Sequence, residues 1–151
     1  MRIWLASEED LDHATRLITE FRAWYGRQTP SEEEMRASVA RIAAEDGEFL
    51  LAAVDDGEPA GVCQVRYRWS VWTSAPDCWI EDVFVNEGSR GIGLGRGLVE
   101  AAVVRARERG CRRIELDVDE ANDPALSLYE SLGFSGDFKA EKRSLLLGVE
   151  I

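Results

Sequence analysis

The stretch that decides the fold of this chain is EDVFVNEGSRGIGLGRGL, residues 81–98. It begins as an apolar strand pattern, passes through a short polar turn and becomes a glycine-dense loop that leads directly into a helix pattern. The first turn of a helix carries unpaired backbone N–H groups and a partial positive charge, and glycine lets a ligand approach them closely. The stretch therefore predicts a site for phosphate or pyrophosphate, to which Arg90 and Arg96 can add charge.

Three phosphate-binding patterns can be compared with this loop. A Walker loop needs Lys followed by Ser or Thr after its last glycine, and neither follows here. The dinucleotide pattern Gly-x-Gly-x-x-Gly fails in every register, because Arg96, Leu98 or Glu100 stands at the sixth position. The third pattern, Arg/Gln-x-x-Gly-x-Gly/Ala, is matched in full by RGIGLG, residues 90–95. In this respect the loop resembles the acetyl-CoA pyrophosphate loop of the GNAT superfamily of N-acetyltransferases.

A second motif lies downstream, at NDPALSLYESLGF, residues 122–134. It is similar to the block Asn-x-x-Ala-x-x-Leu-Tyr-x-x-x-Gly-Phe of the same superfamily, and it follows the first motif after one predicted helix and one predicted strand. The resemblance covers nearly the whole chain and is strongest from 80 to 134. It implies acetyl-CoA as the cofactor, with these residues around it: Val83, Phe84, Val85, Arg90, Gly91, Ile92, Gly93, Leu94, Gly95, Arg96, Asn122, Pro124, Ala125 and Tyr129.

Composition excludes several other classes of protein. The 151 residues, 45% hydrophobic and 31% charged, predict one globular domain over 1–151. No apolar run approaches the roughly 20 residues that cross a membrane, the N-terminus lacks a signal-peptide core, and the three cysteines form no disulfide framework or metal pattern. A cytoplasmic protein is expected. The net charge of −11 disfavours nucleic acid and favours a cationic partner.

Periodicity and turn signals predict the order of the elements. A short strand is expected at 2–6, a first helix from a Ser7 cap to Gly26, and a second helix from 30–31 to about 46–47. Strands are expected at 49–54, 60–69 and 78–85, followed by a helix that starts from the glycine loop and runs through Arg109. A strand is then expected at 113–118, and after it a helix that Asn122 caps and that runs through Leu132. A last strand is expected at 142–149. This is the GNAT order, βααβββαβα with closing β structure. The resemblance implies an α/β (α+β) fold with a mixed, mostly antiparallel sheet of six or seven strands and about four helices, and a homodimer.

Acetyl transfer to an amine needs three groups. Tyr129 can protonate the departing thiolate, because a phenol with a pKa near 10 keeps its proton at pH 7, and the resemblance gives it this role. Backbone N–H groups near 83–85 can stabilise the oxyanion. Glu81 is the candidate base, or else it only binds the substrate ammonium. Glu81 and Asp82 point to opposite faces of a regular strand, and the bulge that the resemblance implies would relax this.

The acceptor is predicted from aromatic and acidic residues. Rings beside carboxylates hold organic cations, and Trp24, Tyr25, Trp69, Trp72, Glu81 and Asp82 are the candidates. The IEDVFV stretch, residues 80–85, resembles the acidic strand of spermidine/spermine N-acetyltransferases, which implies a small cationic amine or polyamine. The alternatives are a protein or amino-acid N-acetyltransferase, a non-catalytic acyl-CoA-binding regulatory module and, less favoured, a nucleotide-binding domain.

Overall fold

The structure, a computed structural model, describes residues 1–136 and 149. The chain forms two compact units, residues 1–117 and 118–151, and each is described here by itself. The first unit holds the sheet, three α-helices and the glycine-rich loop. The second holds the second motif.

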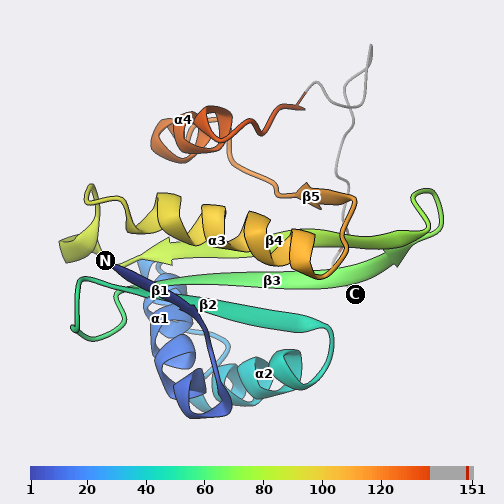
Figure 1. Ribbon diagram of the computed structural model, residues 1–151. Coiled ribbons are helices and arrows are strands. Elements are labelled where there is room, and N and C mark those ends of the chain that lie inside the picture. The colour runs from blue at the N-terminus through green and yellow to red at the C-terminus, as the bar shows by residue number, and fades with distance from the viewer. Residues whose placement is uncertain (137–148, 150–151) are drawn as a thin grey trace. The chain divides into compact units, whose positions relative to one another are not determined.

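The sheet of the first unit has five strands in the order of the sequence (Figure 1). The strands β1 to β4 pair antiparallel with their neighbours, and β5 runs parallel to β4. Their bounds are Arg2–Leu5 for β1, Gly47–Ala53 for β2, Gly61–Ser70 for β3, Ala75–Val85 for β4 and Arg113–Glu115 for β5.

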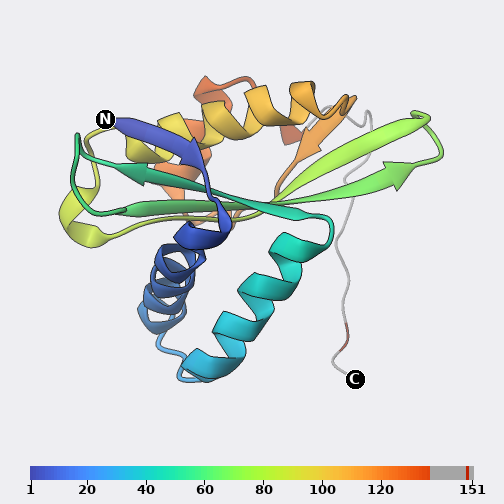
Figure 2. The same cartoon turned by 60° about the horizontal axis from the view of Figure 1, so that its bottom comes forward.

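Helices cover both faces of this sheet (Figure 2). The helices α1, Leu11–Trp24, and α2, Glu32–Ala44, lie on one face, and α3, Leu94–Glu108, lies on the other. The core under α1 and α2 consists of apolar side chains that are almost fully buried: Ala14, Leu17, Ile18, Val39, Phe49, Leu51, Val62 and Phe84. Burial of a side chain such as Leu17 stabilises the fold by about 1.5–3 kcal/mol.

The C-terminal half of α3 is tied to the sheet by ion pairs. The guanidinium of Arg105 donates to both carboxylate oxygens of Glu48 on β2, at 2.8 and 2.9 Å. The hydroxyl of Tyr67 donates to the same carboxylate at 2.8 Å. Because these bonds are partly buried and charge-assisted, they fix the helix on the sheet more firmly than a surface ion pair would. Its N-terminus is thereby held beside the end of β4.

The second unit contains α4, Asp123–Ser131. Asn122 is its N-cap, as predicted, and the Oδ1 atom of Asn122 accepts a hydrogen bond from the Ala125 N–H at 3.3 Å. Gly133 follows the helix with φ +87°, the left-handed conformation that glycine adopts without strain.

The predicted fold class and element order are confirmed, and some boundaries are corrected. The sheet has five strands among the described residues rather than six or seven; the strand predicted at 142–149 lies outside them, apart from residue 149. The strand β4 begins at Ala75 rather than Cys78, because Ala75, Pro76 and Asp77 pair with β3. The strand β5 ends at Glu115 rather than at 118, and α2 ends at Ala44.

The three cysteines are free, and two of them are buried. Within residues 1–136 and 149, no group of His, Cys, Asp and Glu side chains is arranged to hold a metal ion. None of the helices in this part of the chain is both long enough and apolar enough to cross a membrane.

Candidate functional site

A β-bulge interrupts β4 at Glu81. Gln64 pairs with Asp82 and its neighbour Val65 pairs with Ile80, so Glu81 is an extra residue without a partner on β3. Ile80 and Asp82 would share a face of a regular strand, and the bulge places them on opposite faces. A bulge in this strand is the irregularity that the resemblance implied, and the structure places it at Glu81.

The bulge sets which side chains face α1. Residues that pair directly across antiparallel strands project to the same face, so Asp82 lies beside Gln64 and Phe84 lies beside Val62 on the face that α1 and α2 cover. Val83 and Val85 project to the opposite face, toward α3. Glu81 itself is exposed. The half-buried side chain of Asp82 therefore lies on the face of the sheet that α1 covers, while the side chain of Glu81 is exposed to solvent.

The strands β4 and β5 part just before the bulge. β5 pairs with β4 only at Asp77, Cys78 and Trp79, although β4 continues to Val85. Among the described residues no other strand pairs with this edge of β4. Within residues 1–136 and 149, the backbone groups of 80–85 on this edge therefore have no partner strand, an arrangement that suits an extended ligand with amides in the manner of an added strand.

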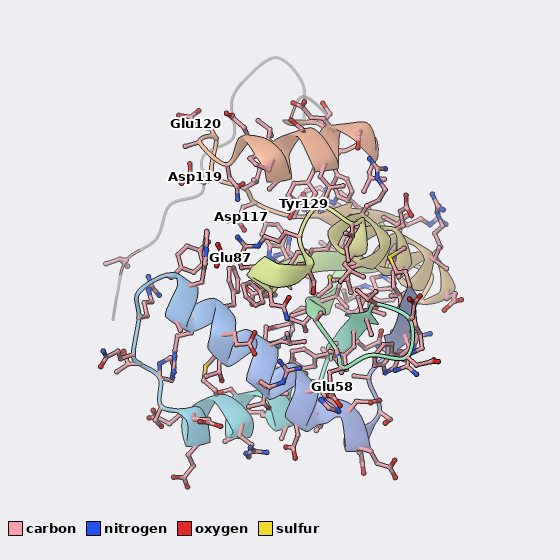
Figure 3. The ribbon with its side chains drawn as sticks, turned by 90° about the vertical axis from the view of Figure 1, so that its left-hand side faces the viewer. Glu58, Glu87, Asp117, Asp119, Glu120 and Tyr129 are labelled. Atoms are coloured by element: carbon pink, nitrogen blue, oxygen red, sulfur yellow. The ribbon has the colours of Figure 1, made fainter. Side chains whose placement is uncertain are left out.

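The pKa of Asp82 differs strongly from the ordinary value of an aspartate. Burial raises it, and the negative charges of Glu81 and Asp117 raise it further, to about 6. Asp117 follows β5 (Figure 3). The sequence did not reveal that Asp117 affects the pKa of Asp82, because Asp117 was expected to belong to a strand over 113–118. Asp82 is thus a carboxylate that is still mostly ionised at pH 7 and yet a stronger base than usual.

The glycine-rich loop has the geometry of an anion site. After β4, the short 3-10 helix η2, Glu87–Ser89, leads to the loop, in which Gly91 and Gly93 have φ of +79° and +95°. Gly93 is the N-cap of α3 and provides no side-chain cap. The first intrahelical bond runs from the Gly97 N–H to the Gly93 carbonyl at 3.0 Å. The N–H groups of the first helical turn, at 94–96, precede this bond and have no acceptor within the helix.

The two arginines of the loop differ in their contacts. Arg96 lies 3.6 Å from Glu100, one turn along the exposed face of α3. Arg90 donates its Nε–H to the Val85 carbonyl at 2.9 Å, and its guanidinium lies 5.4 Å from the ring centroid of Trp24 and 5.8 Å from that of Phe84. The side chain of Arg90 therefore contacts α1 and the end of β4.

The C-terminal end of α1 brings aromatic rings to the end of β4. Phe21 stacks on Phe84 with ring centroids 5.1 Å apart, and Tyr25 lies 4.9 Å from Phe21. Trp24 and Tyr25 are 55% and 61% exposed, so most of their surface is open to a ligand. Of the predicted acceptor residues, Trp24 and Tyr25 are thus held next to the strand that carries Glu81 and Asp82.

Trp69 and Trp72 lie elsewhere. Trp69 pairs with Pro76, and Trp72 lies in the turn between β3 and β4, where it is 92% exposed. At about 3.3 Å per residue, Pro76 is roughly 20 Å along β4 from Asp82. The structure does not bring these two tryptophans to the acidic residues, because the long β3–β4 hairpin carries them away from the bulge.

The predicted residues of the second unit lie on α4 and at its start. Pro124 and Ala125 belong to the first turn of α4. Tyr129, which Figure 3 labels, lies farther along the same helix. The Tyr129 ring contacts Phe134 with centroids 5.9 Å apart. This unit thus presents the second motif as one capped helix whose tyrosine packs against Phe134.

Known proteins resemble this chain over most of its length. The model of the acetyltransferase (GNAT) family matches residues 3–134. Streptothricin acetyltransferase of Streptomyces lavendulae is 39% identical over 90 residues, which are 60% of this chain and 46% of that protein. Thialysine N-epsilon-acetyltransferase of Sus scrofa is 34% identical over 82 residues, 51% of this chain and 48% of that protein. The chain thus matches about half the length of each of these curated relatives.

A solved structure agrees over the whole chain. The crystal structure of a protein from Arthrobacter sp. FB24, described as a putative acetyltransferase, superposes with a TM-score of 0.86 at 27% identity. The match covers 100% of this chain and 96% of that one.

Proposed function

This chain belongs to the GNAT family of acetyltransferases, and we propose that it transfers the acetyl group of acetyl-CoA to a primary amine of a small cationic compound or polyamine. One observation carries the proposal most strongly. An open strand edge, a bulge with two carboxylates and an anion-binding loop follow one another within residues 80–96, in the order that a thioester with a long phosphorylated tail requires.

The residues present fit the cofactor. The free N–H groups at the start of α3 suit a pyrophosphate, and the left-handed glycines Gly91 and Gly93 leave no side chain between it and the backbone. The open edge of β4 at 80–85 suits the amides of the pantetheine arm. When bound, acetyl-CoA supplies the thioester carbon that the amine attacks and releases coenzyme A as a thiol.

Protons move through side chains of this chain. An amine with a pKa near 10 arrives as an ammonium and must lose a proton before its nitrogen can form a bond to carbon. Asp82 is suited to accept that proton, because its pKa of about 6 makes it a stronger base than an ordinary aspartate. Glu81, exposed on the bulge, is suited to bind the ammonium. Tyr129 would supply the proton that a departing thiolate needs, and the N–H groups of residues 83–85 would stabilise a carbonyl oxygen that gains negative charge.

The names of the relatives support an amine acceptor. One is named for streptothricin and the other for the epsilon nitrogen of thialysine. In this chain the acidic bulge and the exposed rings of Trp24 and Tyr25 favour a cation. A cytoplasmic homodimer is part of the same proposal, and light scattering after size exclusion would measure its mass.

Release of free thiol from acetyl-CoA, measured with spermidine, putrescine, lysine and a neutral amino acid, tests the reaction and the acceptor class. Turnover with the cationic amines is expected. Preference for the neutral amino acid would contradict the acceptor class, and thiol release with none of a wider amine panel would favour a non-catalytic acyl-CoA-binding module.

Tyr129→Phe tests the acid. Loss of the hydroxyl should lower kcat roughly 10²–10⁴-fold while acetyl-CoA affinity changes little. Tyr67→Phe makes the same chemical change at the buried bond to Glu48, where it should reduce stability and leave kcat within about twofold. A kcat of Tyr129→Phe within twofold of the unmodified protein from pH 6 to 9 would exclude Tyr129 as the acid.

A further inference from the structure

Arg90 connects the glycine-rich loop with the ends of β4 and α1. Its backbone opens the glycine-rich loop, one residue before Gly91. Its side chain reaches the carbonyl of Val85 at the end of β4 and lies over the rings of Trp24 and Phe84. Residues 90–95 and the C-terminal end of α1 are therefore joined by one side chain.

The rings that Arg90 contacts form a connected cluster, which we call the α1 aromatic cluster: Phe21, Trp24, Tyr25 and Phe84. Phe84 is buried, and Phe21 packs on it at 5.1 Å. Trp24 lies farther out, 6.1 Å from Phe21 and 5.0 Å from Tyr25. Because the Trp24 ring is 55% exposed, few buried contacts fix its position, and the guanidinium of Arg90 is one of the groups that do.

The charge of Arg90 is not neutralised by a carboxylate within the described residues. The Arg90 side chain contacts a carbonyl and two aromatic faces, although the chain has 29 acidic residues against 18 basic ones. A cation that is held by a carbonyl and by rings keeps these contacts only while the loop stays in place beside α1. The position of the loop therefore contributes to holding the Trp24 ring, in addition to the contacts of that ring with Phe21 and Tyr25.

We propose that Arg90 is a positioning residue that couples the cofactor loop to the α1 aromatic cluster, so that binding of coenzyme A fixes Trp24 and strengthens binding of the acceptor. The inference rests on the proposed function, since it needs the loop to bind the cofactor and Trp24 to border the acceptor. Coupling between two sites is reciprocal, and effects of about 5- to 150-fold are typical. With one exposed guanidinium as the link, the low end, about five- to tenfold, is expected.

Fluorescence of Trp24 tests this without turnover. Coenzyme A is titrated into the unmodified protein and into Trp24→Phe, and the fluorescence of Trp24 is obtained by subtracting the emission of the variant from that of the unmodified protein. This difference should change on binding, and in Arg90→Gln the change at saturation should fall at least fivefold. Calorimetry of the same samples gives the coenzyme A affinity, which separates loss of the signal from loss of binding.

Arg96→Gln is the matched control, because Arg96 lies in the first turn of α3, directly after the loop, and pairs with Glu100 on the same helix. It should weaken coenzyme A binding and keep the full Trp24 response at saturation. In steady-state kinetics Arg90→Gln should raise the acceptor KM about five- to tenfold with kcat within about twofold.

The outcomes separate this inference from the proposed function. Calorimetric binding of coenzyme A without a Trp24 response, or an equal response in Arg90→Gln, overturns the coupling and leaves the acetyltransferase proposal standing. A response that depends on Arg90 in a protein that acetylates no amine supports the coupling and overturns the proposed reaction. Absence of coenzyme A binding overturns both.

Discussion

Replacing Asp82 with Asn is expected to stabilise the protein at pH 8 and to have no such effect at pH 4. Burial, followed by the charges of Glu81 and Asp117, raises the pKa of Asp82 to about 6 in the folded protein, against about 3.9 in an unfolded chain. The folded state thus holds the proton more tightly, and ionisation of Asp82 costs folding free energy. This cost is absent below about pH 4, grows between pH 4 and 6 and is complete above pH 6.

The size of the effect follows from the difference between the two pKa values. About two pH units at 1.36 kcal/mol each correspond to about 3 kcal/mol, and partial contact of Asp82 with water lowers this to about 1–2 kcal/mol. Asn has the shape of Asp and no charge, so Asp82→Asn should raise the free energy of unfolding by this amount at pH 8. Urea denaturation of both proteins at pH 8, 6 and 4 measures it.

Asp56→Asn serves as the control, because it makes the same replacement in the exposed turn between β2 and β3, where a change below about 0.5 kcal/mol is expected. A gain for Asp82→Asn that is as large at pH 4 as at pH 8, or a loss at pH 8, would refute the raised pKa. The more stable variant should also lose the rise in kcat/KM near pH 6 that titration of the base gives.

Two further variants test the loop and the bulge. Gly93→Val places a β-branched side chain at φ +95° and between the backbone and the phosphate, so calorimetry should show at least tenfold weaker acetyl-CoA binding, and unchanged affinity would contradict the loop assignment. Deletion of Glu81 removes the bulge and leaves Ile80 and Asp82 opposite Val65 and Gln64, so circular dichroism should show a folded variant whose kcat is about 10²-fold lower. Glu81→Gln is the control, because it removes the carboxylate and keeps the bulge. Equal losses of kcat in both variants would show that the carboxylate matters rather than the backbone geometry.

Features set by neighbours a few residues apart could be predicted from the sequence. Ser31 caps α2 through the N–H of Glu34, and Asn122 caps α4 through the N–H of Ala125, each three residues away. The glycine loop and its helix were predicted for the same reason, since residues 90–98 contain both the left-handed glycines and the start of the apolar pattern.

Features that depend on distant partners could not be predicted in the same way. The position of the bulge depends on the register between β3 and β4, which no local pattern around Glu81 reveals. Trp72 is nine residues from Glu81 in sequence, but most of these residues belong to an extended strand, so the two side chains lie far apart. The RGIGLG motif predicts the backbone of the loop, yet the direction of the Arg90 side chain depends on Trp24, which comes from another element.

The open edge of β4 also has a consequence for the protein in solution before any ligand arrives. An unpaired strand edge with apolar residues such as Val83 and Val85 is a template on which strands of other molecules can add, the first step of aggregation. The bulge twists the edge away from a straight ladder, and the charges of Glu81 and Asp82 repel an approaching acidic copy. We therefore expect Glu81 and Asp82 to act as gatekeepers that disfavour edge-to-edge pairing between copies of the protein.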